Sequence, residues 1–208
     1  MSALKKHTID ISLTSTKKPS PHRPSKDEAE NAVRTLLAWA GDNPSREGLL
    51  DTPKRVVKAF DEWFAGYSQD ASQILSRVFT DVSGYDDMVL LRDIDVKSHC
   101  EHHMAPFIGT AHIAYLPAGG VVGISKIARL VDMYAKRLQT QENLTAQIAT
   151  AMDTHLKSRG CAIIIKAVHQ CMTTRGAQHP NVATITKQFT GMFKDDSLLQ
   201  QEFLALIQ

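Results

Sequence analysis

The sequence lacks the features that mark membrane, secreted and nucleic-acid-binding proteins. None of its apolar runs approaches the roughly 18 residues that a membrane-spanning helix requires. The N-terminal stretch contains lysines and histidines but not the apolar segment of a secretory signal. The net charge of +2 is too small to indicate a nucleic-acid partner. We therefore expect a cytoplasmic protein with no membrane and no nucleic-acid partner.

Cysteine is also scarce, which limits the roles that thiols can have. The chain has three cysteines, an odd number, and this does not fit a disulfide framework. Metal binding, or free thiols in a reducing compartment, fits better. The hydrophobic fraction of 43% and the charged fraction of 22% are ordinary for a soluble globular protein. A chain of 208 residues is expected to form one medium-sized domain with an appendage.

Three regions are expected along the chain. Residues 1–24 are rich in Ser, Thr, Lys and Pro and have no periodic apolar face, which is typical of a flexible tail. Residues 25–80 are predicted to be an N-terminal helical region. Its first helix begins with a capping box at Ser25 and its second has Pro53 in the first turn. Residues 81–208 are predicted to be the main domain.

The order of elements in the main domain favours an α+β fold. Residues 89–96 and 108–116 have the alternation of two paired strands. The elements predicted after them are a helix with Ser125 as its N-cap, a helix that ends at Gly160, strands over 161–168 and 182–189, and a closing amphipathic helix. This order predicts an antiparallel sheet that carries helices on one face.

The densest group of reactive side chains lies in residues 98–106, between the first two predicted strands. Cys100 and His103 have the spacing with which a turn can present a thiolate and an imidazole to one zinc ion. Pro106 is expected to prevent regular pairing from starting smoothly there. Cys171, from a second group that follows a later strand, would be the third protein ligand. Three protein ligands and one open position are the pattern of a catalytic zinc site.

The second group also indicates which histidines take part in the chemistry. In an extended chain alternate side chains point to the same side, so His169 would lie beside Cys171. Cys161 is excluded as a fourth ligand, because ten residues of strand span roughly 33 Å. Zinc lowers the pKa of bound water to about 7, and hydrolysis then needs proton donors and acceptors. His102 and His169 are the candidates, since imidazole titrates near neutral pH.

Other side chains indicate an anionic substrate. A hydroxyl, an ammonium and a guanidinium (Ser125, Lys126 and Arg129) lie near a predicted helix N-terminus, where free N–H groups attract phosphate. Arg175 follows Cys171 within a short turn. Gln141 and Glu142 open a helix, and a glutamate there can accept two N–H bonds from a guanine edge, although it can also simply complement the helix dipole.

These motifs together resemble the GTP cyclohydrolase I family. The resemblance covers residues from about 27 to the C-terminus, with five motifs in order. The motifs are Thr52-Pro53-Lys54-Arg55-Val56, Cys100-Glu101-His102-His103, Gly123-Ile124-Ser125-Lys126 with Arg129, Gln139-Thr140-Gln141-Glu142-Asn143-Leu144-Thr145, and His169-Gln170-Cys171-Met172 with Arg175-Gly176.

The resemblance implies a tunnelling fold, with residues 81–208 as the catalytic domain. It implies self-association into a homo-decamer of two pentamers with active sites between subunits, and hydrolysis of GTP to 7,8-dihydroneopterin triphosphate and formate. The roles it implies are zinc ligands at Cys100, His103 and Cys171; proton transfer at His102 and His169; guanine recognition at Gln141 and Glu142; and triphosphate contacts at Ser125, Lys126, Arg129 and Arg175, joined by Arg55 and Lys58 of a neighbouring subunit.

The sequence departs from the family pattern at a few positions, and it leaves alternatives open. Asn143 replaces a common arginine and Leu138 a common proline, which we expect to alter packing or subunit contacts but not chemistry. A nucleoside deaminase would need a His-x-Glu and a later Cys-x-x-Cys, which are absent. A non-catalytic member that keeps a structural zinc would need neither His102 nor His169. A nitrile-reducing relative would need a catalytic cysteine context that the sequence lacks.

Overall fold

The protein is described by a computed structural model that covers residues 23–82 and 84–208. The predicted flexible tail therefore lies outside the described residues, except for Arg23 and Pro24, which lead into the first helix. The element order is two longer helices with short helical turns, then a sheet interleaved with a helix pair, and finally two helices at the C-terminus. In the described part of the chain, no helix combines the length and apolar character needed to span a membrane.

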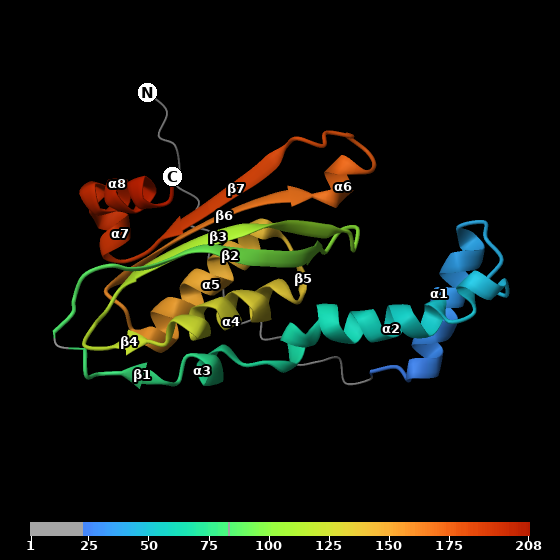
Figure 1. Cartoon of the computed structure of the whole chain (residues 1–208), viewed down its shortest axis with the longest axis horizontal. Helices are drawn as coiled ribbons and strands as arrows, with labels where there is room; N and C mark the ends of the chain where they lie inside the picture. The colour runs from blue at the N-terminus through green and yellow to red at the C-terminus, as the bar shows by residue number, and fades with distance from the viewer. Residues whose placement is uncertain (1–22, 83) are drawn as a thin grey trace, which may run out of the picture.

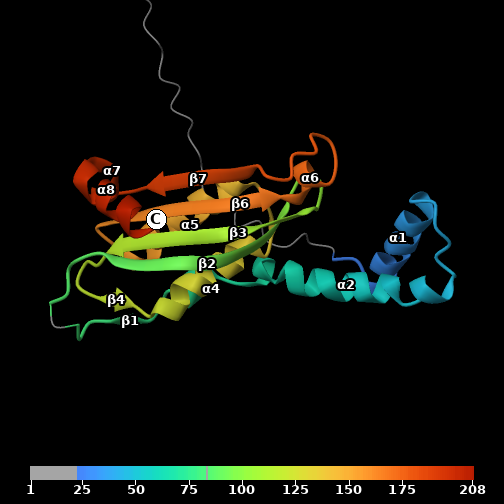
Figure 2. The same cartoon turned by 45° about the horizontal axis from the view of Figure 1, so that its top comes forward.

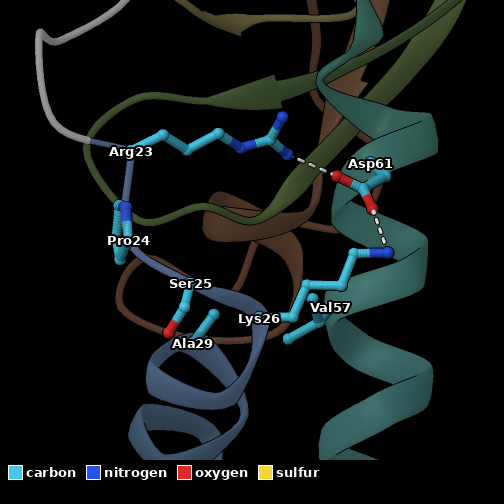
Figure 3. A pocket seen from close by; sticks show the side chains of 7 residues that line it. All are labelled: Arg23, Pro24, Ser25, Lys26, Ala29, Val57 and Asp61. Atoms are coloured by element: carbon cyan, nitrogen blue, oxygen red, sulfur yellow. Dashed lines mark hydrogen bonds and ion pairs between the residues drawn. The ribbon is translucent and has the colours of Figure 1, made fainter.

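The two N-terminal helices form an arm that extends away from the sheet (Figure 1). α1 (Lys26–Trp39) begins with both bonds of the predicted capping box, between Ser25 and Glu28. α2 (Thr52–Trp63) follows after η1 (Glu47–Leu49). Asp61 of α2 forms ion pairs with Arg23 at 2.5 Å and Lys26 at 4.0 Å, across a surface hollow of about 550 Å³ (Figure 3). These exposed pairs are expected to contribute little to stability.

The main domain contains a five-stranded sheet in the order β5-β2-β3-β6-β7. β2 (Val89–Cys100), β3 (Pro106–Leu116), β6 (Gly160–His169) and β7 (Ala183–Phe189) pair antiparallel, as the sequence predicts. β5 (Leu138–Gln139) adds a short parallel edge beside the last two residues of β2. The α+β prediction is confirmed.

Helices cover one face of this sheet (Figures 1 and 2). α4 (Ile124–Ala135) and α5 (Gln141–Leu156) bury side chains such as Leu130 and Ile148 against Ile163 of β6. Full burial of such a side chain stabilises the fold by about 1.5–3 kcal/mol. A second, smaller cluster forms where α7 (Met192–Asp195) and α8 (Ser197–Leu206) pack against the ends of β3 and β6. The remaining elements are η2 (Ala65–Ser68), α3 (Ala71–Ile74), β1 (Val78–Phe79), β4 (Val121–Val122) and α6 (Gln170–Thr173).

Three local predictions are wrong. α4 begins at Ile124 with Gly123 as its N-cap, so Ser125 lies inside the first turn and caps nothing. Pro106 does not delay pairing but starts β3, with His99 as its partner. A proline is tolerated at the first residue of a strand because its missing N–H is not needed there. α5 ends at Leu156, before Gly160, because Lys157 takes the left-handed conformation (φ 50°).

Candidate active site

A tight turn at the end of β2 holds the first two predicted zinc ligands. The backbone N–H of Cys100 donates to the Ala105 carbonyl and its carbonyl accepts from Met104, each at 2.8 Å. Met104 is in the left-handed region at φ 54°, which lets the chain reverse within a few residues. Cys100 Sγ then lies 4.0 Å from Nδ1 of His103 and 3.6 Å from Nδ1 of His102.

The third predicted ligand reaches this turn through the pairing of β3 with β6. Phe107 is opposite His169 in that register, so the end of β6 lies beside the turn. Here the chain is not extended as predicted: β6 ends at His169, and Cys171 belongs to the one-turn helix α6. Ligand atoms of Cys100, His103 and Cys171 nevertheless all lie within 4.8 Å of one another.

The chemistry of this group fits a metal of the zinc type. Two thiols and an imidazole bind Zn²⁺ in preference to hard cations such as Mg²⁺. Burial raises the pKa of Cys171, and the adjacent Cys100 raises it further. A bound cation would act in the opposite sense, by favouring the thiolates. Cys161 lies apart from the group, buried against Thr190 and Asp153, as the sequence predicts.

His169 is the more rigidly held of the two predicted proton-transfer residues. Its ring stacks on Phe107, with centroids 4.5 Å apart and planes 10° from parallel. Its Nε2 lies 2.9 Å from Oε1 of Gln141. Burial lowers the pKa of His169, and the charge of Glu142 partly opposes this shift. The imidazole is therefore neutral at pH 7 and able to accept a proton.

His102 and His99 lie in contrasting surroundings. The His102 side chain is 64% exposed, and its Nε2 is 3.9 Å from a carboxylate oxygen of Glu101. His99 is buried, with its ring against Trp63, the last residue of α2, and Phe64, which follows it. Burial lowers the pKa of His99. A ring that is buried against aromatic side chains in this way has a structural role.

Comparison with known proteins gives the family. The sequence model for GTP cyclohydrolase I matches residues 29–208. The protein named GTP cyclohydrolase 1 of Maricaulis maris is 61% identical over 186 residues, which cover 89% of this chain and 91% of that protein. Its namesake in Hyphomonas neptunium is 63% identical over 185 residues, covering 89% and 90%. This chain belongs to the GTP cyclohydrolase I family. A third namesake, from Pelagibacter ubique, is 55% identical over 198 residues, covering 95% and 96%.

The two residues that the family resemblance assigns to guanine are placed differently. Glu142 is exposed in the first turn of α5. Gln141, one position earlier, is only 1% exposed, and its amide nitrogen lies within 3.2 Å of three acceptors on β6 and β7. Glu142 therefore has a carboxylate to offer a ligand, whereas the Gln141 side chain is enclosed in the protein.

Within one chain, the predicted triphosphate contacts are spread over distant places. Arg175 lies beside the metal group, with its Nη1 2.9 Å from Nε2 of His103. Lys126 lies in the first turn of α4 and Arg129 in its middle, whereas it is the end of α4 that leads to β5 and the turn (Figure 1). Lys126 is nine residues before the last residue of α4 and Arg129 is six, which is roughly 14 Å and 9 Å along the helix axis.

The arm carries the remaining predicted contacts, and β5 contains a residue that departs from the expected pattern. Arg55 and Lys58 line a shallow surface hollow on α2 with Asp51, and Arg55 pairs with Asp51 at 3.4 Å. Leu138, at which the resemblance leads one to expect proline, donates its backbone N–H to the Tyr67 hydroxyl at 3.1 Å. A proline could not make this bond, so the substitution adds a link between β5 and the segment after α2.

Proposed function

We propose that this protein hydrolyses GTP at C8 of the purine, opens the imidazole ring and releases formate to give 7,8-dihydroneopterin triphosphate. This is the first step of pterin formation for folate or tetrahydrobiopterin. The observation that carries the proposal is the convergence of Cys100, His103 and Cys171, with His169 two positions from Cys171. Identities of 55–63% to proteins named GTP cyclohydrolase 1, over most of their length, support it.

Cys100, His103 and Cys171 would hold one Zn²⁺ per subunit. Bound zinc supplies Lewis acidity, which makes water a nucleophile near neutral pH. Three protein ligands leave room for a substrate or water at a fourth place, as a hydrolytic site requires. The site thus has the composition of a catalytic rather than a structural zinc centre.

His169 and His102 would move the protons of the reaction. A neutral imidazole can accept a proton from the attacking water and return it to a ring nitrogen of the purine. His169 is suited to this task because it is rigidly stacked and uncharged at pH 7. His102 would be the second proton carrier, on an exposed side chain that solvent reaches.

The substrate would be held at both ends. Glu142 would accept hydrogen bonds from the guanine edge, while Ser125, Lys126, Arg129 and Arg175, with Arg55 and Lys58, would bind the triphosphate. Holding both ends fixes C8 relative to the metal, which converts a bimolecular attack into a positioned one. Because Lys126 and Arg129 lie on α4 before the end that leads to the metal group, we infer that another subunit contributes to a complete site.

Self-association into a decamer of two pentamers would complete the site. Within residues 23–82 and 84–208, β7 pairs only with β6. On the side of β2 that faces away from β3, only the last two residues of β2 are paired, with β5. The sheet thus has two long unpaired edges, which proteins usually cover. Pairing of β7 of one copy with β2 of the next would close a ring of sheets and cover both edges.

The test is a product assay with the zinc-loaded protein. Incubation with GTP is expected to release formate and to yield a product that becomes a fluorescent pterin after oxidation. The control is the same protein after zinc has been removed by a chelator, which should give neither product. Release of phosphate with the guanine ring intact would contradict the proposed reaction.

A further inference from the structure

Gln141 links His169 to two strands of the sheet. Its amide nitrogen lies 3.0 Å from the Ile165 carbonyl oxygen, 3.1 Å from that of Thr184 and 3.2 Å from Oγ1 of Thr186. Its amide oxygen lies 2.9 Å from Nε2 of His169. With an exposed fraction of 1%, this side chain is shielded from solvent.

These contacts determine which way each group donates. A carbonyl oxygen can only accept, so the atom of Gln141 that faces Ile165 and Thr184 must be the amide nitrogen. The amide oxygen therefore faces His169, and it too can only accept. Nε2 of His169 must then carry the proton of the neutral ring, which leaves Nδ1 with its lone pair.

The hydroxyls of two threonines fix the same direction independently. Thr145 Oγ1 lies 2.8 Å from the backbone carbonyl of Gln141, so it donates there. Thr186 Oγ1 lies 2.7 Å from Thr145 Oγ1 and must donate to it, which leaves the Thr186 oxygen to accept from the Gln141 amide. The bonds thus run in one direction around a closed loop that begins and ends at Gln141. A network in which every member is satisfied is rigid.

We propose that Gln141 is a positioning residue that holds His169 in the Nε2-protonated tautomer and presents Nδ1 to the substrate as the proton-transfer atom. Stacking on Phe107 holds the plane of the ring, and the bond to Gln141 prevents the ring from turning over. The inference rests on the proposed function of His169 and replaces direct guanine recognition by the Gln141 side chain. Glu142, which is exposed, remains for the base.

Steady-state kinetics separate positioning from guanine recognition. Gln141→Met keeps the length of the side chain but removes the bond to His169. Positioning predicts that kcat falls about 10–100-fold, as for other partners that orient an imidazole, with KM for GTP within about twofold of the wild type and zinc content unchanged. Direct recognition of guanine predicts instead a raised KM with kcat preserved, and this result would overturn the proposal.

A matched control comes from the same buried network. Thr186→Val removes one acceptor of the Gln141 amide, but the carbonyls of Ile165 and Thr184 still hold that amide. Thr186→Val is expected to lose thermal stability while retaining kcat within about threefold. An equal loss of kcat in Thr186→Val and Gln141→Met would mean that general loosening explains the effect, and the positioning role would be rejected.

A measurement on the unmodified protein covers the case in which Gln141→Met does not fold. Nitrogen-15 NMR of histidine-labelled holoenzyme distinguishes protonated from unprotonated ring nitrogens, and His169→Ala identifies the signals of His169. The Nε2-protonated tautomer is expected, and the Nδ1-protonated tautomer would disprove the proposal. This measurement does not depend on turnover, so it stays informative even if the wild-type protein fails to release formate from GTP, a result that would reject the proposed function alone.

Discussion

At the scale of single residues, His169 and Cys171 are only two positions apart but have different surroundings, one suited to proton transfer and the other to metal binding. The strand β6 ends at His169, and α6 begins at the next residue. Thr173 Oγ1 donates to the His169 carbonyl at 2.9 Å, which stabilises the change from strand to helix. The imidazole therefore stacks on Phe107 and bonds to Gln141, while the thiol faces Cys100 and His103.

This separation predicts different results for two substitutions. His169→Ala is expected to keep its zinc and to lose turnover by about 10²–10⁴-fold, the usual contribution of a general acid or base. Cys171→Ala should lose zinc, and with it all activity. Metal analysis of the purified variants beside the formate assay checks both. An empty metal site in His169→Ala would show that the division between ligand and proton carrier is wrong.

Cys161 is expected to be the inert thiol of the protein. Burial raises its pKa to about 12 from an ordinary 9.0, so at pH 8.5 its thiolate fraction is about a thousandfold lower than that of a free thiol. Iodoacetamide should leave it unmodified in the native protein and modify it in urea, as peptide mass spectrometry can measure. Because the unfolded state ionises first, this thiol should also cost stability as the pH rises from 9 towards 12. Modification at the same rate in both states would disprove the assignment.

At the scale of elements, the β3–β6 pair determines where the site forms. Gly109 lies opposite Ala167, and a Cβ at this position would be 1.9 Å from the Lys166 carbonyl oxygen and 2.5 Å from Cα of Ala167. Both contacts are with backbone, which cannot move aside as a flexible side chain can. The two strands approach closely here because glycine has no side chain.

Gly109→Ala is therefore expected to force β3 and β6 apart. Overpacking of this kind costs about 1–3 kcal/mol or more of the free energy of unfolding, seen as a lower Tm. Turnover should fall too, because Phe107 on β3 holds the ring of His169. The control is Thr110→Ala, the next residue on the same strand, which removes atoms and adds none. Equal Tm values for the two variants would contradict the close approach.

The same elements show what the sequence could and could not predict. The capping box of α1 was predictable because its partners, Ser25 and Glu28, lie three residues apart. The residue at which β2 ends was not predictable, because Cys100 pairs with Gln139 of β5, which lies far along the chain. Gln141 bonds to strands 24 and 43 residues away, so no local pattern reveals its partners. The metal-ligand residues can be identified from short sequence motifs, whereas the contacts that hold them in place depend on the register of the sheet.

At the scale of the whole molecule, the helical arm exposes more apolar surface than an isolated subunit needs. In the described part of the chain none of the α1 residues is buried, and Trp39 and Leu36 are 88% and 64% exposed. α1 also lies apart from the sheet, so the domain's own core cannot cover it (Figure 2). Exposed apolar patches of this kind mark interaction sites, and in the proposed assembly the partner is a second copy of the chain.

Trp39→Asp tests this role of the arm. If the arms join two pentameric rings, the wild-type particle should have a mass of about 230 kDa, ten copies of the 23.0 kDa chain, and the variant about half of it. Each ring contains five copies of the chain, so one substitution places a charge in five contacts at once. We expect this to separate the two rings. Multi-angle light scattering after size-exclusion chromatography measures both masses.

The control for Trp39→Asp is Ala38→Asp. It adds the same charge in the same helical turn, about 100° around the helix from Trp39 and about 200° from Leu36. Ala38 is exposed, so its substitution should leave the mass of the particle unchanged. Because the two variants share their effect on net charge and on the helix dipole, a smaller mass in Trp39→Asp alone assigns ring pairing to the apolar face of α1. An undiminished mass in Trp39→Asp would mean that other surfaces join the rings and that the exposed tryptophan has another partner.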